Sequence, residues 1–430
     1  MKTTYYIVFI LLLVSSFFFF ETVSFSQEKT KTVASNSDDN FIETLLSKYP
    51  KEFKNILLNS KKYNVQIIYT QINRDKNNVP SFKQYTYHLD PRKYFYPASL
   101  VKLTCSALAL EKINDLKINS LDKNSCMQTD SSYICQHKVT RDSTAKNSIP
   151  SVANYIKRML LVSDNEAYSR IYELLGQQYI KDQLAKKGYP NINIIHRFDI
   201  NCNHEQNKCT NKITFCDTQG KVIYNQPLAT CSNEIKNPLG TVKMGIGYYD
   251  FNGKFYRQPK DCTNMNYMCL EDITDILKSI MFPNSVAKEK RFNLTNDDYT
   301  FLYKYLSMYP RESDYPRYNM KDFEDSYKKY FMYGSFHKKI ETDSVRIFNI
   351  VGQSYGNLAD CAYIINYERK IEFMLSAVIY VNEDEILNDN IYEYKTIGFP
   401  FLNDLGNVIY NYELKRKKNY LPDLTTFKLR

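Results

Sequence analysis

A serine and a lysine lie three positions apart in the stretch YPASLVKLTC, at Ser99 and Lys102. Residues with this spacing share one face of a helix, so the Lys102 amine can reach the Ser99 hydroxyl. A lysine whose pKa is lowered by burial can accept the serine proton, and the first turn of a helix stabilises a developing oxyanion. The pair therefore predicts a nucleophilic serine with a lysine as its general base.

The spacing alone has little specificity, because Ser-x-x-Lys occurs seven times in the chain. Two features of the context distinguish Ser99 from the other six. Pro97 lies two residues before it, and the residues that follow, 100–113, are mostly apolar. This pattern predicts a central, buried helix, and burial is the condition that a neutral lysine requires.

The tripeptide Ser163-Asp164-Asn165 occurs once in the sequence. A second serine can relay a proton between the lysine and a leaving group, an asparagine amide can hold a substrate carbonyl, and the aspartate can fix the loop. The alternative is a helix cap followed by a polar turn. Because the tripeptide lies in a helical region downstream of Ser99, we favour the chemical interpretation.

The elements that must position these residues come from both ends of the chain. The expected strands cover 63–72, 83–89, 344–351, 361–367 and 371–381. The expected helical regions cover 39–59, 99–113, 150–188, 298–308 and 402–415. This order predicts an α/β (α+β) fold with one antiparallel sheet built from both chain ends, flanking helices and a mostly helical insertion. Residues 189–290 lack periodicity, so we expect irregular structure there and assign them no role.

The first 26 residues have the layout of a secretory signal peptide, with one lysine before an uncharged apolar run over 3–20 and small residues near the end. A retained anchor helix is the alternative, because the run is near the length that spans a bilayer. We expect cleavage, so that the mature chain is exported to the periplasm or the medium without stable membrane insertion. The expected parts are a signal peptide over 1–26, a disordered linker over 27–39, and one domain over 40–430 whose sheet subdomain is 40–97 and 340–430 and whose helical and irregular subdomain is 98–339.

The 430 residues carry a formal net charge of +10 that is spread along the sequence. Basic stripes of the kind that bind nucleic acid are lacking, so nucleic acid is not an expected partner. The excess favours small anionic partners such as cell-wall material. The sequence gives no prediction of the oligomeric state.

Ten cysteines in an exported chain predict disulfides. Cys105 and Cys361 lie in apolar stretches and are interpreted as buried thiols. Local bridges are predicted for the close pairs Cys126/Cys135, Cys202/Cys209 and Cys262/Cys269, although spacing alone does not determine the connectivity. A zinc site is the alternative for the group Cys202, His204, Cys209 and Cys216, and its irregular spacing disfavours it.

With both motifs and this order of elements, the chain resembles the class A β-lactamases and related penicillin-recognising serine hydrolases. The segments FNIVGQSYG and IEFMLSAVIYVNEDEILND are also similar to a branch of exported β-lactamase-related serine hydrolases of Bacteroidetes-type bacteria. The resemblance implies a β-lactamase/transpeptidase-like fold, no cofactor and no metal, and a β-lactam or peptidoglycan-like amide as substrate. It implies these roles: nucleophile Ser99, base Lys102, relay Ser163, and substrate contacts from Asn165, Gly352 and Gln353.

The sequence departs from the family at the third motif, Lys-Thr-Gly, where a cation meets the substrate carboxylate. The matching place reads Ile350-Val351-Gly352, so the backbone at Gly352-Gln353 can still present an N–H, but the cation is missing. Lys395-Thr396 lies after all three closing strands and is interpreted as a coincidence. The candidates for a replacement charge are Arg346, Lys338 and Lys339.

A second departure concerns the loop glutamate that activates the deacylating water in class A enzymes. The corresponding region, about 188–215, holds only two acids, Asp199 and Glu205, as candidates. Glu166 adjoins the tripeptide and is interpreted as a first-turn helix charge. We therefore expect acylation with slow turnover. The alternative is a catalytically impaired binding or structural protein that retains the fold.

Overall fold

The structure is a computed structural model that describes residues 40–131, 135, 137–336 and 339–428. The predicted signal peptide (1–26) and linker (27–39) lie outside these residues. Over the described part of the chain, every helix is too short or too polar to cross a membrane.

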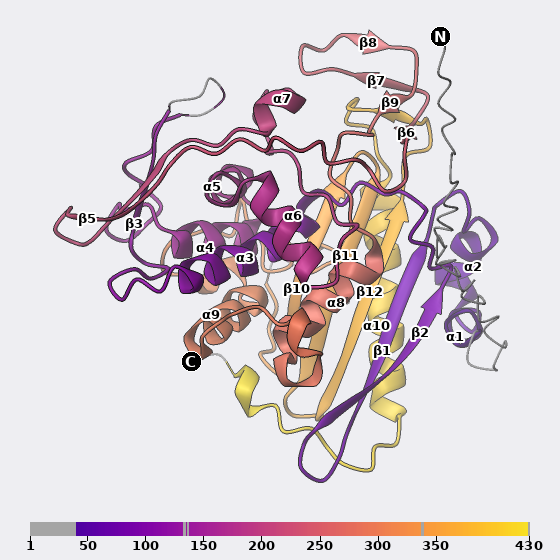
Figure 1. The fold of residues 1–430 in the computed structure, drawn as a ribbon. Coiled ribbons are helices and arrows are strands. Elements are labelled where there is room, and N and C mark those ends of the chain that lie inside the picture. Colours follow the sequence, from indigo (N-terminus) through magenta and orange to yellow (C-terminus); the bar gives the residue numbers. More distant parts are fainter. Residues whose placement is uncertain (1–39, 132–134, 136, 337–338, 429–430) are drawn as a thin grey trace, which may run out of the picture. The chain divides into compact units, whose positions relative to one another are not determined.

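The centre of the fold is a five-stranded antiparallel sheet with the strand order β10-β11-β12-β1-β2 (Figure 1). Strand β1 pairs with β2 on one side and with β12 on the other, so the two chain ends meet inside one sheet. This arrangement confirms the predicted fold class. The strands are β1 (Gln66–Arg74), β2 (Pro80–Tyr87), β10 (Val345–Ser354), β11 (Asn357–Asn366) and β12 (Ile371–Tyr380).

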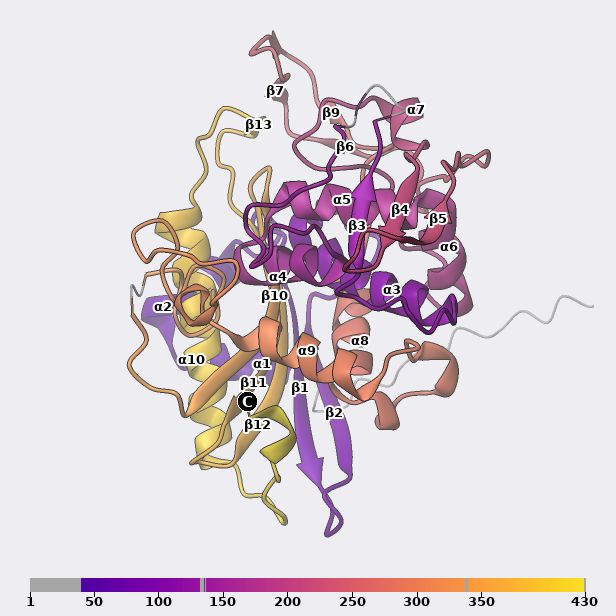
Figure 2. The same cartoon turned by 90° about the vertical axis from the view of Figure 1, so that its left-hand side faces the viewer.

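Helices cover both faces of the sheet (Figures 1 and 2). One face packs against three helices, α1 (Phe41–Leu46), α2 (Pro50–Leu58) and α10 (Phe399–Lys415). The other face packs against the helical part, α3 (Val101–Asp115), α4 (Val152–Val162), α5 (Asn165–Leu175), α6 (Gln177–Lys186), α8 (Leu270–Met281) and α9 (Asn296–Ser307). Because both faces are covered, β10, β11 and β12 are buried along nearly their whole length, which explains their continuous apolar sequence.

The region 189–290 is less irregular than predicted. Its α8 was missed, although Ile273, Ile276, Leu277 and Ile280 have helical spacing and are all buried. The other elements of the region are short: α7 (His204–Asn207), β4 (Ile213–Cys216), β5 (Val222–Gln226), β6 (Lys243–Met244), β7 (Gly247–Tyr249), β8 (Phe255–Tyr256) and β9 (Lys260–Asp261). Two of them pair with distant segments, because β4 joins β3 (Cys126–Thr129) and β7 joins β13 (Ile386–Leu387).

The cysteines pair differently from the prediction. A disulfide joins Cys135 to Cys202, so the predicted bridges Cys126/Cys135 and Cys202/Cys209 are wrong. The third predicted pair, Cys262/Cys269, consists of two buried free thiols. The same disulfide removes Cys202 from the alternative zinc site. Cys105 and Cys361 are buried free thiols, as predicted.

Candidate active site

Ser99 lies in a single 3-10 turn, η1 (Ala98–Leu100), which leads directly into α3. The turn is closed by a hydrogen bond of 3.0 Å from the Leu100 N–H to the Pro97 carbonyl. Ala98 has a φ of +45°, a left-handed conformation that a residue with a side chain adopts at a cost. The chain is therefore held in a strained turn that places the half-buried Ser99 at the amino-terminal end of a helix.

Lys102 is one turn further along, and its side chain is completely buried. Its Nζ donates to the Ser163 carbonyl at 2.5 Å, to the Asn165 Oδ1 at 2.5 Å, and lies 3.0 Å from the Ser163 Oγ. The structure thus brings Lys102 together with both polar ends of the Ser-Asp-Asn tripeptide. Ser99 shares the helical face of Lys102 but makes no side-chain hydrogen bond among the described residues.

The tripeptide is at once a helix cap and a contact of Lys102. Ser163 ends α4 in the left-handed conformation, with a φ of +59°. Asp164 caps α5 by accepting from the Ala167 N–H at 2.9 Å, and it pairs with Arg158 at 2.9 Å. The tripeptide therefore forms a helix end and a helix cap. Its polar groups nevertheless contact Lys102, as a role in catalysis would require.

Three charges and burial determine the protonation of Lys102. Burial lowers the pKa of the amine well below its usual value, and the nearby charge of Lys328 lowers it further. The carboxylates of Asp164 and Asp199 act in the opposite direction. A neutral amine has one lone pair, and among its three partners only the Ser163 hydroxyl can donate a proton to it. The geometry therefore allows a proton to pass between the Ser163 hydroxyl and a neutral Lys102 amine.

Gly352 allows the edge strand β10 to approach the turn that carries Ser99. A Cβ atom at this position would lie 2.5 Å from the Pro97 carbonyl oxygen and 3.1 Å from the Leu100 Cγ. Because Cβ atoms do not approach backbone oxygens so closely, only glycine permits this contact. The sequence at Ile350-Val351-Gly352 therefore keeps the glycine for a steric reason.

The backbone of Gln353 faces the open edge of the sheet. Tyr355 and Gly356 both have positive φ, +50° and +76°, and form the two-residue type I′ turn of the β10–β11 hairpin. In such a hairpin the residue pair next to the turn, Ser354 and Asn357, exchanges backbone hydrogen bonds. The next pair, Gln353 and Leu358, is therefore a non-hydrogen-bonded pair. The N–H of Gln353 is consequently directed away from β11, and β10 is the edge strand that packs on η1.

Two cavities of about 560 and 550 Å³ meet at Ser99. Both are lined by Ser99, Asn165 and Gln353, so the predicted nucleophile and two of the three predicted substrate contacts share one cleft, whereas Gly352 lines neither cavity. Ser163 lines the first cavity. The site residues predicted from distant parts of the sequence therefore converge in space.

The second cavity has an aromatic wall that sequence analysis did not predict. Tyr96, His196, Phe198 and Tyr355 line it, with the Tyr96 and His196 rings stacked at 6.0 Å between centroids. The His196 Nδ1 donates to the Arg197 carbonyl at 2.8 Å, and burial lowers the pKa of His196 to about 4. This histidine is therefore neutral at physiological pH.

Two of the three candidates for the missing cation, Arg346 and Lys339, are held in ion pairs with other residues. Arg346 is bound by Glu312 and Asp343, each at 2.8 Å, and Lys339 pairs with Glu341. The third candidate, Lys338, lies outside the described residues, and Lys395-Thr396 belongs to a single π-helical turn before α10. Among the described residues that line the first cavity, Lys328 is the one basic side chain, and sequence analysis missed it.

Of the two candidate acids, one lies at the site. Asp199 lines the second cavity and accepts from the Asn165 Nδ2 at 2.7 Å. Glu205 is exposed and pairs with Lys208 at 2.8 Å. Glu166 occupies the first turn of α5 and pairs with Arg158 and Arg170, which confirms it as a helix charge.

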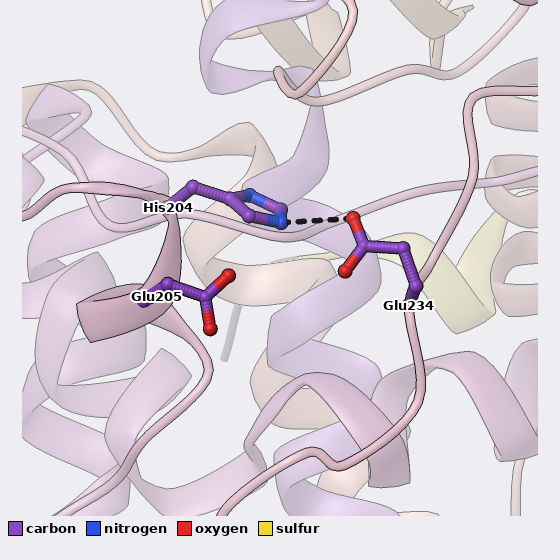
Figure 3. Close-up of side chains that lie close together, drawn as sticks. All are labelled: His204, Glu205 and Glu234. Carbon is purple, nitrogen blue, oxygen red and sulfur yellow. Dashed lines mark hydrogen bonds and ion pairs between the residues drawn. The ribbon is translucent and has the colours of Figure 1, made fainter.

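One group of side chains has the composition of a metal site. Among the described residues, His204, Glu205 and Glu234 bring ligand atoms within 4.8 Å of one another, and Figure 3 shows His204 bonded to Glu234. The Lys208 ammonium, however, pairs with both carboxylates, at 2.8 and 2.7 Å. A cation already neutralises this cluster, so the group does not point to a metal ion.

The sequence of residues 48–224 matches the model of the β-lactamase enzyme family. This stretch includes Ser99, Lys102 and the Ser-Asp-Asn tripeptide. A search of curated proteins found no match.

Several solved structures match the chain, each with a TM-score below 0.5. A class A β-lactamase from Clostridium kluyveri is 10% identical, with a TM-score of 0.43 over 87% of this chain and 97% of that one. A β-lactamase from Sphaerobacter thermophilus is 9% identical, with a TM-score of 0.40 over 85% and 96% of the two chains. The TLA-1 extended-spectrum β-lactamase is 12% identical, with a TM-score of 0.45 over 88% and 100%.

Proposed function

We propose that the chain, whose residues 48–224 match the model of the β-lactamase enzyme family, is an exported serine hydrolase acylated at Ser99. The substrate is a β-lactam or a peptidoglycan-like amide. The observation that carries the proposal is the contact of the buried Lys102 amine with Ser163 and Asn165 at the cleft that Ser99 lines.

In the proposed reaction, the Ser99 Oγ attacks the carbonyl carbon of the amide and its proton passes to neutral Lys102. The carbon–nitrogen bond then breaks, and the leaving nitrogen receives a proton from the Ser163 hydroxyl, which Lys102 replenishes. Every proton that leaves Ser99 is thus returned to the leaving group. The 3.0 Å contact of Ser163 with Lys102 supports this relay.

Two backbone N–H groups are proposed to stabilise the oxyanion. The N–H of Ser99 lies at the start of the helix, where no intrahelical acceptor exists, and the N–H of Gln353 points from the sheet edge. The positive end of α3 adds to the stabilisation. We propose Asn165 as a contact of the substrate carbonyl, and Asp199 as the acid that activates the deacylating water, since its carboxylate lies next to Asn165.

Covalent labelling tests the proposal. We expect intact wild-type protein exposed to a penicillin to gain the mass of one opened penicillin, and Ser99→Ala to gain none. The time course of the adduct reports how fast Asp199 or another group supports its hydrolysis. A wild type that reacts with neither a β-lactam nor a fluorophosphonate probe would contradict the enzymatic proposal and favour a binding protein with the same fold.

Gly352→Ala is expected to slow acylation by about 10²- to 10³-fold, the effect of losing one oxyanion donor. The added Cβ would displace β10 from the Pro97 carbonyl, which it meets at 2.5 Å, and would move the Gln353 N–H away from Ser99. The rate of adduct formation by mass spectrometry measures the effect.

Gln353→Ala is the matched control, because it removes a side chain that accepts from the Tyr330 hydroxyl at 3.2 Å but keeps the backbone N–H. We expect its rate to stay within a few-fold of wild type. Equal losses in Gly352→Ala and Gln353→Ala would mean that the side chain, and not the strand position, matters.

A further inference from the structure

Lys328 is a buried lysine whose amine caps a helix of the active site. Its Nζ donates to the Leu160 carbonyl at 2.5 Å and contacts the Met159 carbonyl at 3.4 Å. Both carbonyls belong to the last turn of α4, which ends at Ser163. A cation at the carboxyl end of a helix interacts favourably with the helix dipole and with its last carbonyls, of which Met159 also accepts from the Ser163 N–H at 3.1 Å.

The same residue lines the first cavity together with Ser99 and Ser163. Its charge acts on Lys102, whose pKa it lowers, so the two amines lie within electrostatic range of one another. Lys328 therefore touches the cleft from the side of Ser163.

The sheet holds this lysine in place although its own segment lacks regular structure. Asn349 in β10 donates to the Lys328 carbonyl at 2.6 Å and to the Asp360 Oδ1 at 2.9 Å. Asp360 in β11 in turn accepts from the backbone N–H groups of Tyr330 and Phe331, at 3.2 and 3.1 Å. Asn349 and Asp360 are completely buried. They hold the backbone from the Lys328 carbonyl to Phe331 against β10 and β11.

We infer that Lys328 supplies the cation of the cleft in place of a residue of β10, and that it binds an acidic group of the substrate in the first cavity. This inference rests on the proposed acylation of Ser99. It specifies the substrate class as an amide that carries a carboxylate or a similar anion close to the attacked carbonyl.

The titratable groups around Lys328 lie on β11, on α3 and in its own segment. Asp360 raises the pKa of Lys328, whereas burial lowers it more strongly, to about 7. Burial lowers the pKa values of Lys102 on α3 and of the adjacent Lys329 well below the usual value, and the charge of Lys328 lowers them further. Lys329 itself points inward, donating to the carbonyls of Leu306 and Ile347. An acidic group entering the cavity would stabilise the protonated form of Lys328.

The test compares benzylpenicillin with its methyl ester, which lacks the carboxylate. For wild-type protein and Lys328→Gln, the second-order rate of adduct formation is measured with each probe. We expect the acid-to-ester rate ratio to fall by about 10- to 100-fold in Lys328→Gln, the effect of losing one charge-assisted hydrogen bond. A purely structural role would slow both probes equally and leave the ratio unchanged.

Lys329→Gln is the matched control, because it removes the neighbouring buried lysine without removing Lys328. Its ratio should equal that of wild type. If Lys328→Gln does not fold, the wild-type ratio is measured between pH 6 and 9, where it should fall as Lys328 loses its proton, since effects of Lys102 on the two probes cancel. A ratio that is flat over this range, or unchanged in a folded Lys328→Gln, overturns the inference but not the acylation. Absence of any adduct in the wild type overturns both.

Discussion

Replacing Lys102 by methionine should slow the acylation of Ser99 by about 10²- to 10⁴-fold, the range by which a positioned general base accelerates a reaction. The amine is completely buried and lies between Ser163 and Asn165. Methionine has a similar shape but cannot accept a proton, so the relay through Ser163 is interrupted. The measurement is the rate at which the penicillin adduct accumulates, followed by intact mass.

The pH dependence of the wild-type rate provides a second measurement. The base must be neutral, so the rate falls on the acid side of the pKa of Lys102. Because burial and Lys328 lower this pKa, the plateau should be reached well below pH 10.5. A rate that continues to rise up to pH 10.5 would contradict a lysine base in this environment.

Stability separates this catalytic effect from misfolding. The unfolded chain binds a proton at Lys102 more tightly than the native state does, so the native protein is destabilised below pH 10.5 by carrying this buried amine. We therefore expect the thermal midpoint of Lys102→Met not to fall at neutral pH. Lys102→Arg, which keeps a cation and cannot act as a base, should be as inactive as Lys102→Met. An active arginine variant would indicate an electrostatic role instead.

The motif residues were predictable because local patterns specify their elements. The helix after Ser99 is apolar on all sides, and Ser163 and Asp164 have the chemistry of a helix end and a helix start. The closing strands were likewise recognisable as buried runs. Boundaries were less accurate, since α3 begins at Val101 and Ser99 belongs to the strained turn before it.

The cation of the cleft was not predictable in the same way. The candidates predicted from the third motif were Arg346, Lys338 and Lys339, and the first of them pairs with Glu312 and Asp343. Lys328 lies in a segment without periodicity, and its position follows from long-range bonds to α4, β10 and β11. Spacing along the sequence contains no signal for such contacts.

The predicted disulfide pairs were wrong for a related reason. Pairing by proximity in sequence assumes local loops, but the disulfide Cys135–Cys202 spans 67 positions. The pairing of β3 with β4 similarly places Cys126 opposite Cys216. Both contacts depend on how the insertion folds back on the helices, which periodicity does not report.

Glu173→Gln should lower the free energy of unfolding by about 3 to 5 kcal/mol, the cost of leaving a buried charge without its partner. Glu173 on α5 is completely buried and pairs with the equally buried Arg197, whose Nη2 and Nε lie 2.5 and 2.9 Å from its Oε2. Its Oε1 accepts from the Asn211 Nδ2 at 2.7 Å. The glutamine keeps the shape but not the charge that Arg197 requires. Urea unfolding of both proteins measures the difference.

This ion pair also fixes the aromatic wall of the second cavity. Arg197 lies between His196 and Phe198, and its Nη2 donates to the Cys209 carbonyl at 2.5 Å, so the pair ties this segment to the helix that starts at Asn165. We therefore expect Glu173→Gln to impair acylation as well. The half-saturating penicillin concentration should rise, and the maximal rate should change less.

A surface pair on the same segment provides the control. Glu205 is exposed and pairs with Lys208, so Glu205→Gln should cost less than about 1 kcal/mol. Replacing both buried partners, as Glu173→Leu with Arg197→Met, should cost less than Glu173→Gln alone, because no charge is left unpaired. If Glu173→Gln were no more destabilising than Glu205→Gln, the buried pair would not be what holds His196 and Phe198 at the cleft.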